Sequence, residues 1–148
     1  MKVSDTYAIL RSFESCLMQI EDILSDKTTN NIQLYRLGRR IFGDRFVNVF
    51  TADDNIKLHN GQFCIVNTDA SNKAGLHWLA VYKHKNKYYV FDSFGRDVHK
   101  LSKYFKYKHW TNVEFNRIES YRQNNCGQLC LAWLVKFDKY KTRCIGVI

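Results

Sequence analysis

The chain contains no proline, whereas average usage would place about seven in a sequence of this length. It also lacks internal repeats, low-complexity tracts and any stretch with the composition of a linker. A length of 148 residues corresponds to about one domain and rules out a large multidomain enzyme. We therefore predict a single domain over residues 1–148, with a helical part at about 1–45 and a sheet part at about 46–148.

Long apolar runs are also missing. The sequence has no run of about 18 apolar residues, so it predicts no transmembrane helix. Residues 1–5 lack the apolar stretch that is typical of a signal peptide. We therefore expect an intracellular protein without a membrane partner.

The cysteines lack the spacing of a metal site or a disulfide framework. There are five of them, an odd number, and they form no CxxC motif. Cys126 and Cys130 have no second pair at the spacing of a zinc site. We therefore expect reduced thiols and no bound metal, and the remaining question is whether one thiol is reactive.

Acidic residues are scarce in the second half of the chain. The sequence has 23 Lys and Arg against 14 Asp and Glu, which gives a formal net charge of +9. Residues 1–74 hold nine of each sign, so the whole excess lies in residues 75–148. A basic half favours contact with a polyanion such as nucleic acid. It is also typical of a solvated surface that keeps a small protein soluble, so charge alone leaves both interpretations open.

The hydrophobic pattern predicts helices at both ends of the chain and strands between them. Apolar residues recur at helical spacing over 5–24, and a second short helix is expected over 32–43. Residues 127–140 are apolar almost all round, which indicates a buried helix. Residues 97–109 are expected to form a helix or a helix with a loop. Strands are predicted at 46–50, 62–67, 78–83, 87–91 and 113–118. The fold class is therefore α+β, a small mixed sheet flanked by helices.

Two residues that could take part in proton transfer flank one predicted hairpin. His77 stands where the 78–83 strand begins, and Asp92 stands where the 87–91 strand ends. Residues 84–86 form a turn of hairpin length, so His77 and Asp92 should lie side by side. A carboxylate in that position orients an imidazole. A histidine at a strand end or an aspartate in a turn can also be purely structural.

Cys126 falls where a polar loop becomes the apolar 127–140 helix. Thiols at helix N-termini are activated by the helix dipole and by the N–H groups of the first turn. Gly127 permits close backbone approach and leaves amide groups to face an oxyanion. A nucleophile, a base and an orienting carboxylate together indicate covalent acyl transfer. Structural roles are expected for the other cysteines: Cys16, Cys64, Cys130 and Cys144.

The chain resembles the adenovirus-type cysteine proteases, a family related to the proteases that cleave ubiquitin-like modifiers. The resemblance covers about residues 61–138 and includes the order histidine, aspartate, cysteine. It is carried by Ile65-Val66-Asn67-Thr68, Gly75-Leu76-His77-Trp78, Phe91-Asp92-Ser93-Phe94-Gly95 and Asn125-Cys126-Gly127 with Cys130. It implies a papain-like or adenain-like fold, with the nucleophile at the start of a buried helix. By this resemblance Cys126 is the nucleophile, His77 the general base and Asp92 the group that orients it.

The resemblance also implies residues around this triad. Trp78 and Gly127 are expected to pack at the site. The family usually has a glutamine six or seven residues before the cysteine, whose side-chain amide donates to the oxyanion. This sequence has Ser120 and Glu119 there. Gln123 is the candidate side chain for that role, and the backbone N–H of Cys126 is the other candidate donor.

Members of this family are similar in being basic and in using DNA, in some cases with a disulfide-bound peptide, as activators. Residues 83–108 fit the DNA part, because lysines alternate there with aromatic residues. The candidate DNA contacts are Lys83, Lys85, Lys87, Lys100, Lys103, Lys106 and Lys108. Contacts of this kind with phosphates are sequence-independent and sensitive to salt. No cysteine lies between Cys64 and Cys126 to bind a peptide.

The resemblance therefore implies a cysteine endopeptidase of a virus, virophage or related DNA element. It would cleave capsid or core precursor proteins during virion maturation, in the infected cell and in the virion. We expect a monomer that needs no cofactor for the chemistry and has DNA as an activator. An isopeptidase for ubiquitin-like modifiers and a non-catalytic, basic nucleic-acid-binding domain remain alternatives.

Overall fold

The computed structural model of the chain describes residues 3–69, 77–113 and 124–148. The helices are α1 (Val3–Leu24), α2 (Asn31–Phe42) and α3 (Cys126–Tyr140). The strands are β1 (Phe46–Phe50), β2 (Phe63–Asn67), β3 (Trp78–His84), β4 (Lys87–Phe91) and β5 (Trp110–Asn112). The predicted α+β class is therefore confirmed.

The three predicted helices are confirmed to within two residues at each end. Helix α2 begins at a capping box, in which the Asn30 side chain accepts from the Gln33 N–H and the Gln33 side chain accepts from the Asn30 N–H. Two arginines, Arg39 and Arg40, lie in its last turn, where positive charge is favoured by the helix dipole. None of the described helices is long and apolar enough to cross a membrane.

The five strands form one mixed sheet in the order β1-β2-β3-β4-β5. The two outer pairs are parallel, and β3 is antiparallel to both of its neighbours. A two-residue turn joins β3 to β4, and its residues Lys85 and Asn86 have φ of 48° and 65°, as a type I′ hairpin requires. The predicted hairpin is therefore confirmed, and the start of β3 lies beside the end of β4.

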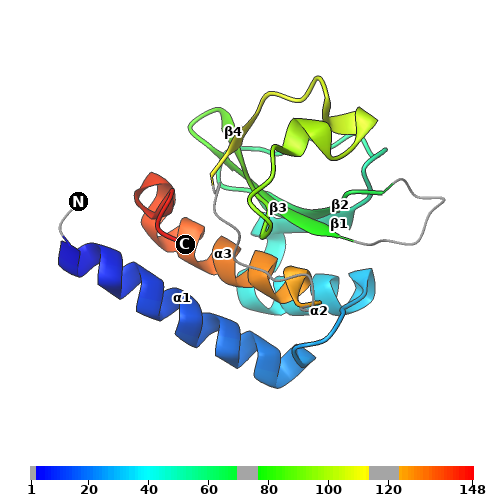
Figure 1. Cartoon of the computed structure of the whole chain (residues 1–148). Helices are drawn as coiled ribbons and strands as arrows, with labels where there is room; N and C mark the ends of the chain where they lie inside the picture. Colours follow the sequence, from blue (N-terminus) through cyan, green and yellow to red (C-terminus); the bar gives the residue numbers. More distant parts are fainter. Residues whose placement is uncertain (1–2, 70–76, 114–123) are drawn as a thin grey trace.

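Both faces of the sheet are buried, but by different kinds of structure. In β2, Phe63 and Ile65 face the core that contains residues of α1, α2 and α3. Cys64 and Val66 alternate with them and face a second core, which the segments 51–62 and 92–109 complete. Figure 1 shows the three helices on one side of the sheet, with the short turns that precede β5 on the other. All the described α-helices therefore cover one face.

The segment 97–109 differs from the predicted helix. It forms two short 3₁₀ turns, Val98–Lys100 and Lys103–Phe105. The Asp97 side chain accepts from the His99 N–H, and the Ser102 side chain accepts from the Tyr104 N–H. Because a second capping residue follows the first after only five positions, one continuous helix is interrupted there.

The last strand also begins earlier than predicted. Strand β5 is Trp110–Asn112, because the Trp110 side chain is buried and its backbone pairs with Tyr88 of β4. The prediction placed a strand over 113–118. Val113 follows β5 directly, and residues 114–118 lie outside the described part of the chain.

Candidate active site

His77 and Asp92 meet at one end of the β3–β4 hairpin. His77 directly precedes β3 and Asp92 directly follows β4, in a register that pairs Ala80 with Phe91. His77 Nε2 lies 2.5 Å from Asp92 Oδ1, and both side chains are buried. The predicted juxtaposition is therefore confirmed. Because Nε2 contacts the carboxylate, Nδ1 is the ring nitrogen on the opposite side from Asp92.

Asp92 is held as a carboxylate by several donors. Besides His77, its oxygens accept from the N–H of Phe94 (3.2 Å), the N–H of Arg96 (3.1 Å) and Arg96 Nε (2.9 Å). Burial raises the pKa of Asp92, but the hydrogen bonds from His77 and Arg96 outweigh it and bring the pKa to about 2. The carboxylate therefore stays ionised at neutral pH and can orient the imidazole.

Arg96 and Phe94 complete this arrangement, and sequence reasoning did not assign them to it. The Phe94 ring lies 5.0 Å from the His77 ring, and the Arg96 guanidinium lies 4.8 Å from the Phe94 ring. The turn after β4 thus supplies both a second ion pair for Asp92 and a ring against the imidazole. Arg96 follows Asp92 by four residues, a spacing that could have suggested an ion pair had the turn been predicted.

Cys126 is the first residue of α3, as predicted, and its side chain is buried. Helix α3 is attached to β3 close to His77, because Cys130 Sγ donates to the backbone carbonyl of Trp78 at 3.4 Å. Residues four apart lie on the same face of a helix, so Cys126 is on the face of α3 that contacts the start of β3. The N-terminal end of α3, where the helix dipole is positive, is therefore directed toward the histidine end of the hairpin.

Gly127 and Trp78 both lie where packing requires them. A Cβ atom on Gly127 would stand 2.9 Å from Leu34 Cδ2 and closer still to Thr29 Oγ1. The close approach at Gly127 is therefore an approach of α2 and the segment before it, rather than one shown to involve substrate. Trp78 is buried in the core beneath the helices.

The candidate oxyanion side chain lies outside the described residues. Gln123, Ser120 and Glu119 all fall within 114–123. The Cys126 backbone, at the first position of α3, is the candidate donor that the structure does describe.

Burial keeps three other thiols in their protonated form. It raises the pKa of Cys144 to about 12 and also raises the pKa of Cys64. Burial also raises the pKa of Cys16, although the nearby Lys136 partly offsets the effect. Thiols of this kind are poor nucleophiles at neutral pH.

The seven candidate DNA-contact lysines lie on the β3–β4 hairpin and on the segment that covers the second face of the sheet. Four of them stand over aromatic rings, in the pairs Lys83–Tyr88, Lys103–Tyr104, Lys106–Tyr107 and Lys108–Trp110. Tyr88 and Trp110 are direct neighbours across β4 and β5, so the first and last of these pairs adjoin. Trp110 itself is buried, so at these two pairs it is the lysines Lys83 and Lys108 that are brought near each other at the edge of the second core.

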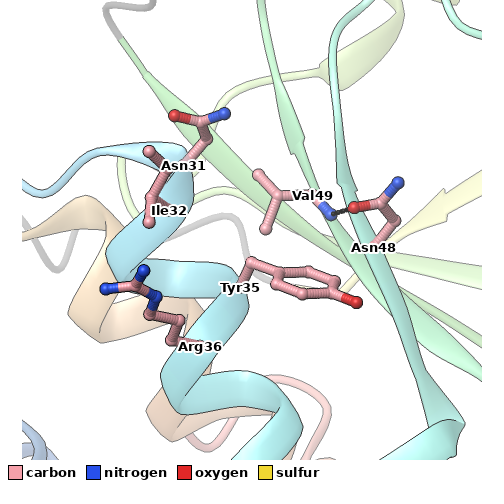
Figure 2. A pocket seen from close by; sticks show the side chains of 6 residues that line it. All are labelled: Asn31, Ile32, Tyr35, Arg36, Asn48 and Val49. Atoms are coloured by element: carbon pink, nitrogen blue, oxygen red, sulfur yellow. Dashed lines mark hydrogen bonds between the residues drawn. The ribbon is translucent and has the colours of Figure 1, made fainter.

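A separate hollow of about 270 Å³ lies between α2 and β1 (Figure 2). In it the Asn48 side chain accepts from the Val49 N–H at 2.8 Å. The lining residues are Asn31, Ile32, Tyr35, Arg36, Asn48 and Val49. They include no thiol, imidazole or carboxylate, so none of the candidate catalytic groups lines this hollow. Among the described residues, no group of three or more His, Cys, Asp or Glu side chains could hold a metal ion.

A buried imidazole–carboxylate pair beside a helix that begins with cysteine is the arrangement of a cysteine protease. Residues 46–122 match the family described as adenovirus endoprotease. The match covers more than half of the chain and contains His77 and Asp92, and it ends before Cys126. The chain therefore belongs to the adenovirus endoprotease family and is a protease of that type. No curated protein matches it significantly.

Proposed function

We propose that the protein is a cysteine endopeptidase in which Cys126, His77 and Asp92 act together. The observation that carries the proposal is the 2.5 Å contact between His77 and Asp92. His77 directly precedes Trp78, whose carbonyl accepts from Cys130, one helical turn after Cys126. The family match covers His77 and Asp92 and so supports their proposed catalytic roles. The role of Cys126 is supported by its place at the start of α3.

The reaction follows from this arrangement. With Asp92 ionised, His77 Nε2–H donates to the carboxylate and Nδ1 accepts the thiol proton of Cys126. The thiolate forms a bond to the carbonyl carbon of the scissile peptide, and donors at the start of α3 stabilise the oxyanion. The C–N bond then breaks, and the imidazolium gives its proton to the leaving amine. Water, deprotonated by His77, hydrolyses the thioester, releases the acid and regenerates the thiol.

The proposed substrates are capsid or core precursor proteins, cleaved during assembly in an infected cell and in the virion. The protein would work as a monomer and would need no cofactor for the chemistry. This proposal for the substrates is supported by the family to which the chain belongs, that of the adenovirus endoprotease.

Cleavage of a precursor tests this proposal. Co-expression of the wild-type chain with a candidate capsid or core precursor should give discrete products, and Cys126→Ala should abolish them. Cys144→Ala, which removes a buried thiol elsewhere, is the matched control and should retain cleavage. Cleavage that persists in Cys126→Ala would contradict the nucleophile assignment. Reaction with a vinyl-sulfone probe of a ubiquitin-like protein, without precursor cleavage, would favour an isopeptidase instead.

We also propose that DNA binds to the basic surface and stimulates cleavage. Residues 77–113 hold eight Lys and Arg but only two acidic residues, Asp92 and Asp97, and both of these contact histidines. The acidic groups of this stretch are thus engaged within the protein, and the lysines flank exposed rings such as Tyr107. Lysines and stacked aromatic side chains suit contact with phosphates and bases.

Salt dependence tests the DNA proposal. Binding to a short duplex should weaken steeply between low and physiological salt, and cleavage should be faster with DNA at low salt. Replacing Lys103 and Lys106 by Gln should reduce the slope of log affinity against log salt by about two. Lys139→Gln is the control, because Lys139 also stands over a tyrosine but on α3. Equal salt slopes for all three proteins would contradict a DNA contact at residues 103–106. Binding without any cleavage of a precursor would favour a non-catalytic domain.

A further inference from the structure

The first turn of α3 is hydrogen-bonded to the end of α1 and to the segment that joins α1 to α2. Asn125 Nδ2 donates to Glu21 Oε1 at 3.0 Å. Gln128 Nε2 donates to two backbone carbonyls, at 2.8 Å to Ser25 and at 2.7 Å to Lys27. These contacts come from the residues on either side of Cys126 and Gly127. We call residues 21–29 the α1–α2 connection.

The packing of Gly127 strengthens this attachment. The absence of a side chain at Gly127 lets Thr29 and Leu34 approach the backbone next to Cys126. Three of the four residues 125–128 therefore contact the α1–α2 connection or the start of α2. In Figure 1 the chain rises from the end of α1 to α2 near the start of α3. The position of this turn is thus set from the helical layer as well as from the sheet.

The contacts between the first turn of α3 and the α1–α2 connection are polar, although apolar contacts at a buried position would make the folded protein more stable. Gln128 is completely buried in a helix whose other buried residues are mostly apolar. Its Oε1, the Oδ1 of Asn125 and the Oγ1 of Thr29 are buried without a hydrogen-bond partner among the described residues. Buried polar atoms without partners lower stability. Departures of this kind are expected where a residue serves a site rather than the core.

We propose that Gln128 is a positioning residue for Cys126. It fixes the first turn of α3 against the α1–α2 connection, while Cys130 fixes the next turn against Trp78. In this role the two contacts fix where the thiol stands relative to His77, and a displacement of about 1 Å can cost on the order of 100-fold in rate. Gln128 does not touch substrate in this role. The inference depends on the proposed function, because it assigns Gln128 to the orientation of the proposed nucleophile.

Gln128→Met tests the proposal, because methionine has a similar size and lacks both donors. The turnover number kcat should fall by roughly 10–100-fold, with KM within about twofold. The rate of alkylation of Cys126 by iodoacetamide should fall as well, and its pH profile should move toward higher pH. Gln128→Glu, which replaces the donor by an acceptor, should lose at least as much activity at neutral pH.

Ser12→Ala is the matched control. Ser12 accepts a hydrogen bond from the buried Lys136 and so also joins α1 to α3, but more than two turns further along the helix. The Ser12→Ala variant should have a lower thermal unfolding temperature, while its kcat and its pH profile of alkylation should be unchanged. If Gln128→Met does not fold, Glu21→Ala, at a partly exposed residue, should show a smaller loss of kcat with the same shift in pH profile.

Unchanged kcat and an unchanged alkylation profile in Gln128→Met would overturn the positioning role while leaving the proposed function intact. Equal losses of kcat in Gln128→Met and Ser12→Ala would also overturn it, because the effect would then be one of stability. A wild-type protein in which Cys126 reacts no faster than the other cysteines would overturn the proposed function itself, and the positioning role with it.

Discussion

Two carboxylates, Asp92 after β4 and Asp138 in α3, are both held by several hydrogen-bond donors, one of which comes from β3 or from the residue before it. Asp138, in α3, accepts from Arg45 at 2.8 and 2.5 Å and from the Tyr82 hydroxyl at 2.7 Å. Burial raises the pKa of each carboxyl, but hydrogen bonds outweigh it and bring the pKa of both to about 2. Both are therefore ionised at neutral pH by the same physical means.

What differs is the partner of each carboxylate. The partners of Asp138 are Arg45, Tyr82 and Lys141, and burial together with Asp138 raises the pKa of Tyr82. Asp138 also raises the pKa of Arg45, so neither Arg45 nor Tyr82 is poised to exchange a proton at neutral pH. The main partner of Asp92 is a histidine with a second ring nitrogen, next to a helix that begins with cysteine. A strongly lowered pKa therefore does not by itself identify a catalytic carboxylate. The carboxylate is identified by the group that it orients.

Replacing each carboxylate by an amide should give the largest difference between the two residues, with Asp92 affecting catalysis and Asp138 affecting stability. Asp92→Asn should lower kcat by about 10²–10⁴-fold, since the imidazole loses the group that fixes its tautomer. Asp138→Asn should lower the unfolding temperature and leave kcat within about twofold. Cleavage kinetics and thermal unfolding of the two variants decide the matter, and similar losses of kcat in both would remove the distinction.

The two arginines should give a smaller contrast of the same kind. Arg96→Met removes one ion pair from Asp92 and the contact with Phe94, so kcat should fall by roughly 3–10-fold. Arg45→Met removes the two contacts with Asp138 and should affect stability alone. Steady-state kinetics at a temperature well below unfolding measure both effects. A larger loss of kcat in Arg45→Met than in Arg96→Met would contradict the account.

The smallest effect should be on acid stability, and here the two carboxylates should behave alike. Each has a folded pKa of about 2 against an ordinary value of 3.8, so the stability it contributes is present above about pH 4 and is lost as the pH falls toward 2. Urea unfolding at pH 6 and pH 3 should show a smaller pH dependence in Asp138→Asn than in the wild type, by roughly 1 kcal/mol. An unchanged pH dependence would show that Asp138 is not held in this way.

The sequence was most informative where a pattern is local. Helical spacing predicted the three helices. A short turn, expected over 84–86, predicted the meeting of His77 with Asp92, because it brings the start of one strand beside the end of the next. The 97–109 segment was predicted wrongly, because its apolar residues have helical spacing while Asp97 and Ser102 each cap a separate short turn.

Other parts of the site depend on contacts between distant residues, which no local pattern contains. Gln128 contacts residues about 100 positions earlier in the chain, and the sequence shows it only as a polar residue in an apolar helix. The ion pair of Arg96 with Asp92 depends on the shape of the turn after β4. The family match adds nothing at Cys126, since it ends at residue 122.

The central claim is that Cys126 is a nucleophile activated by His77, and the rate of alkylation of each cysteine tests it most directly. Mass spectrometry after iodoacetamide treatment of the folded protein resolves the five thiols. Cys126 should react at least about tenfold faster than any other cysteine at neutral pH, keep that advantage in Asp138→Asn and lose it in His77→Ala. Equal rates for all five cysteines, or an advantage of Cys126 that persists in His77→Ala, would contradict the account.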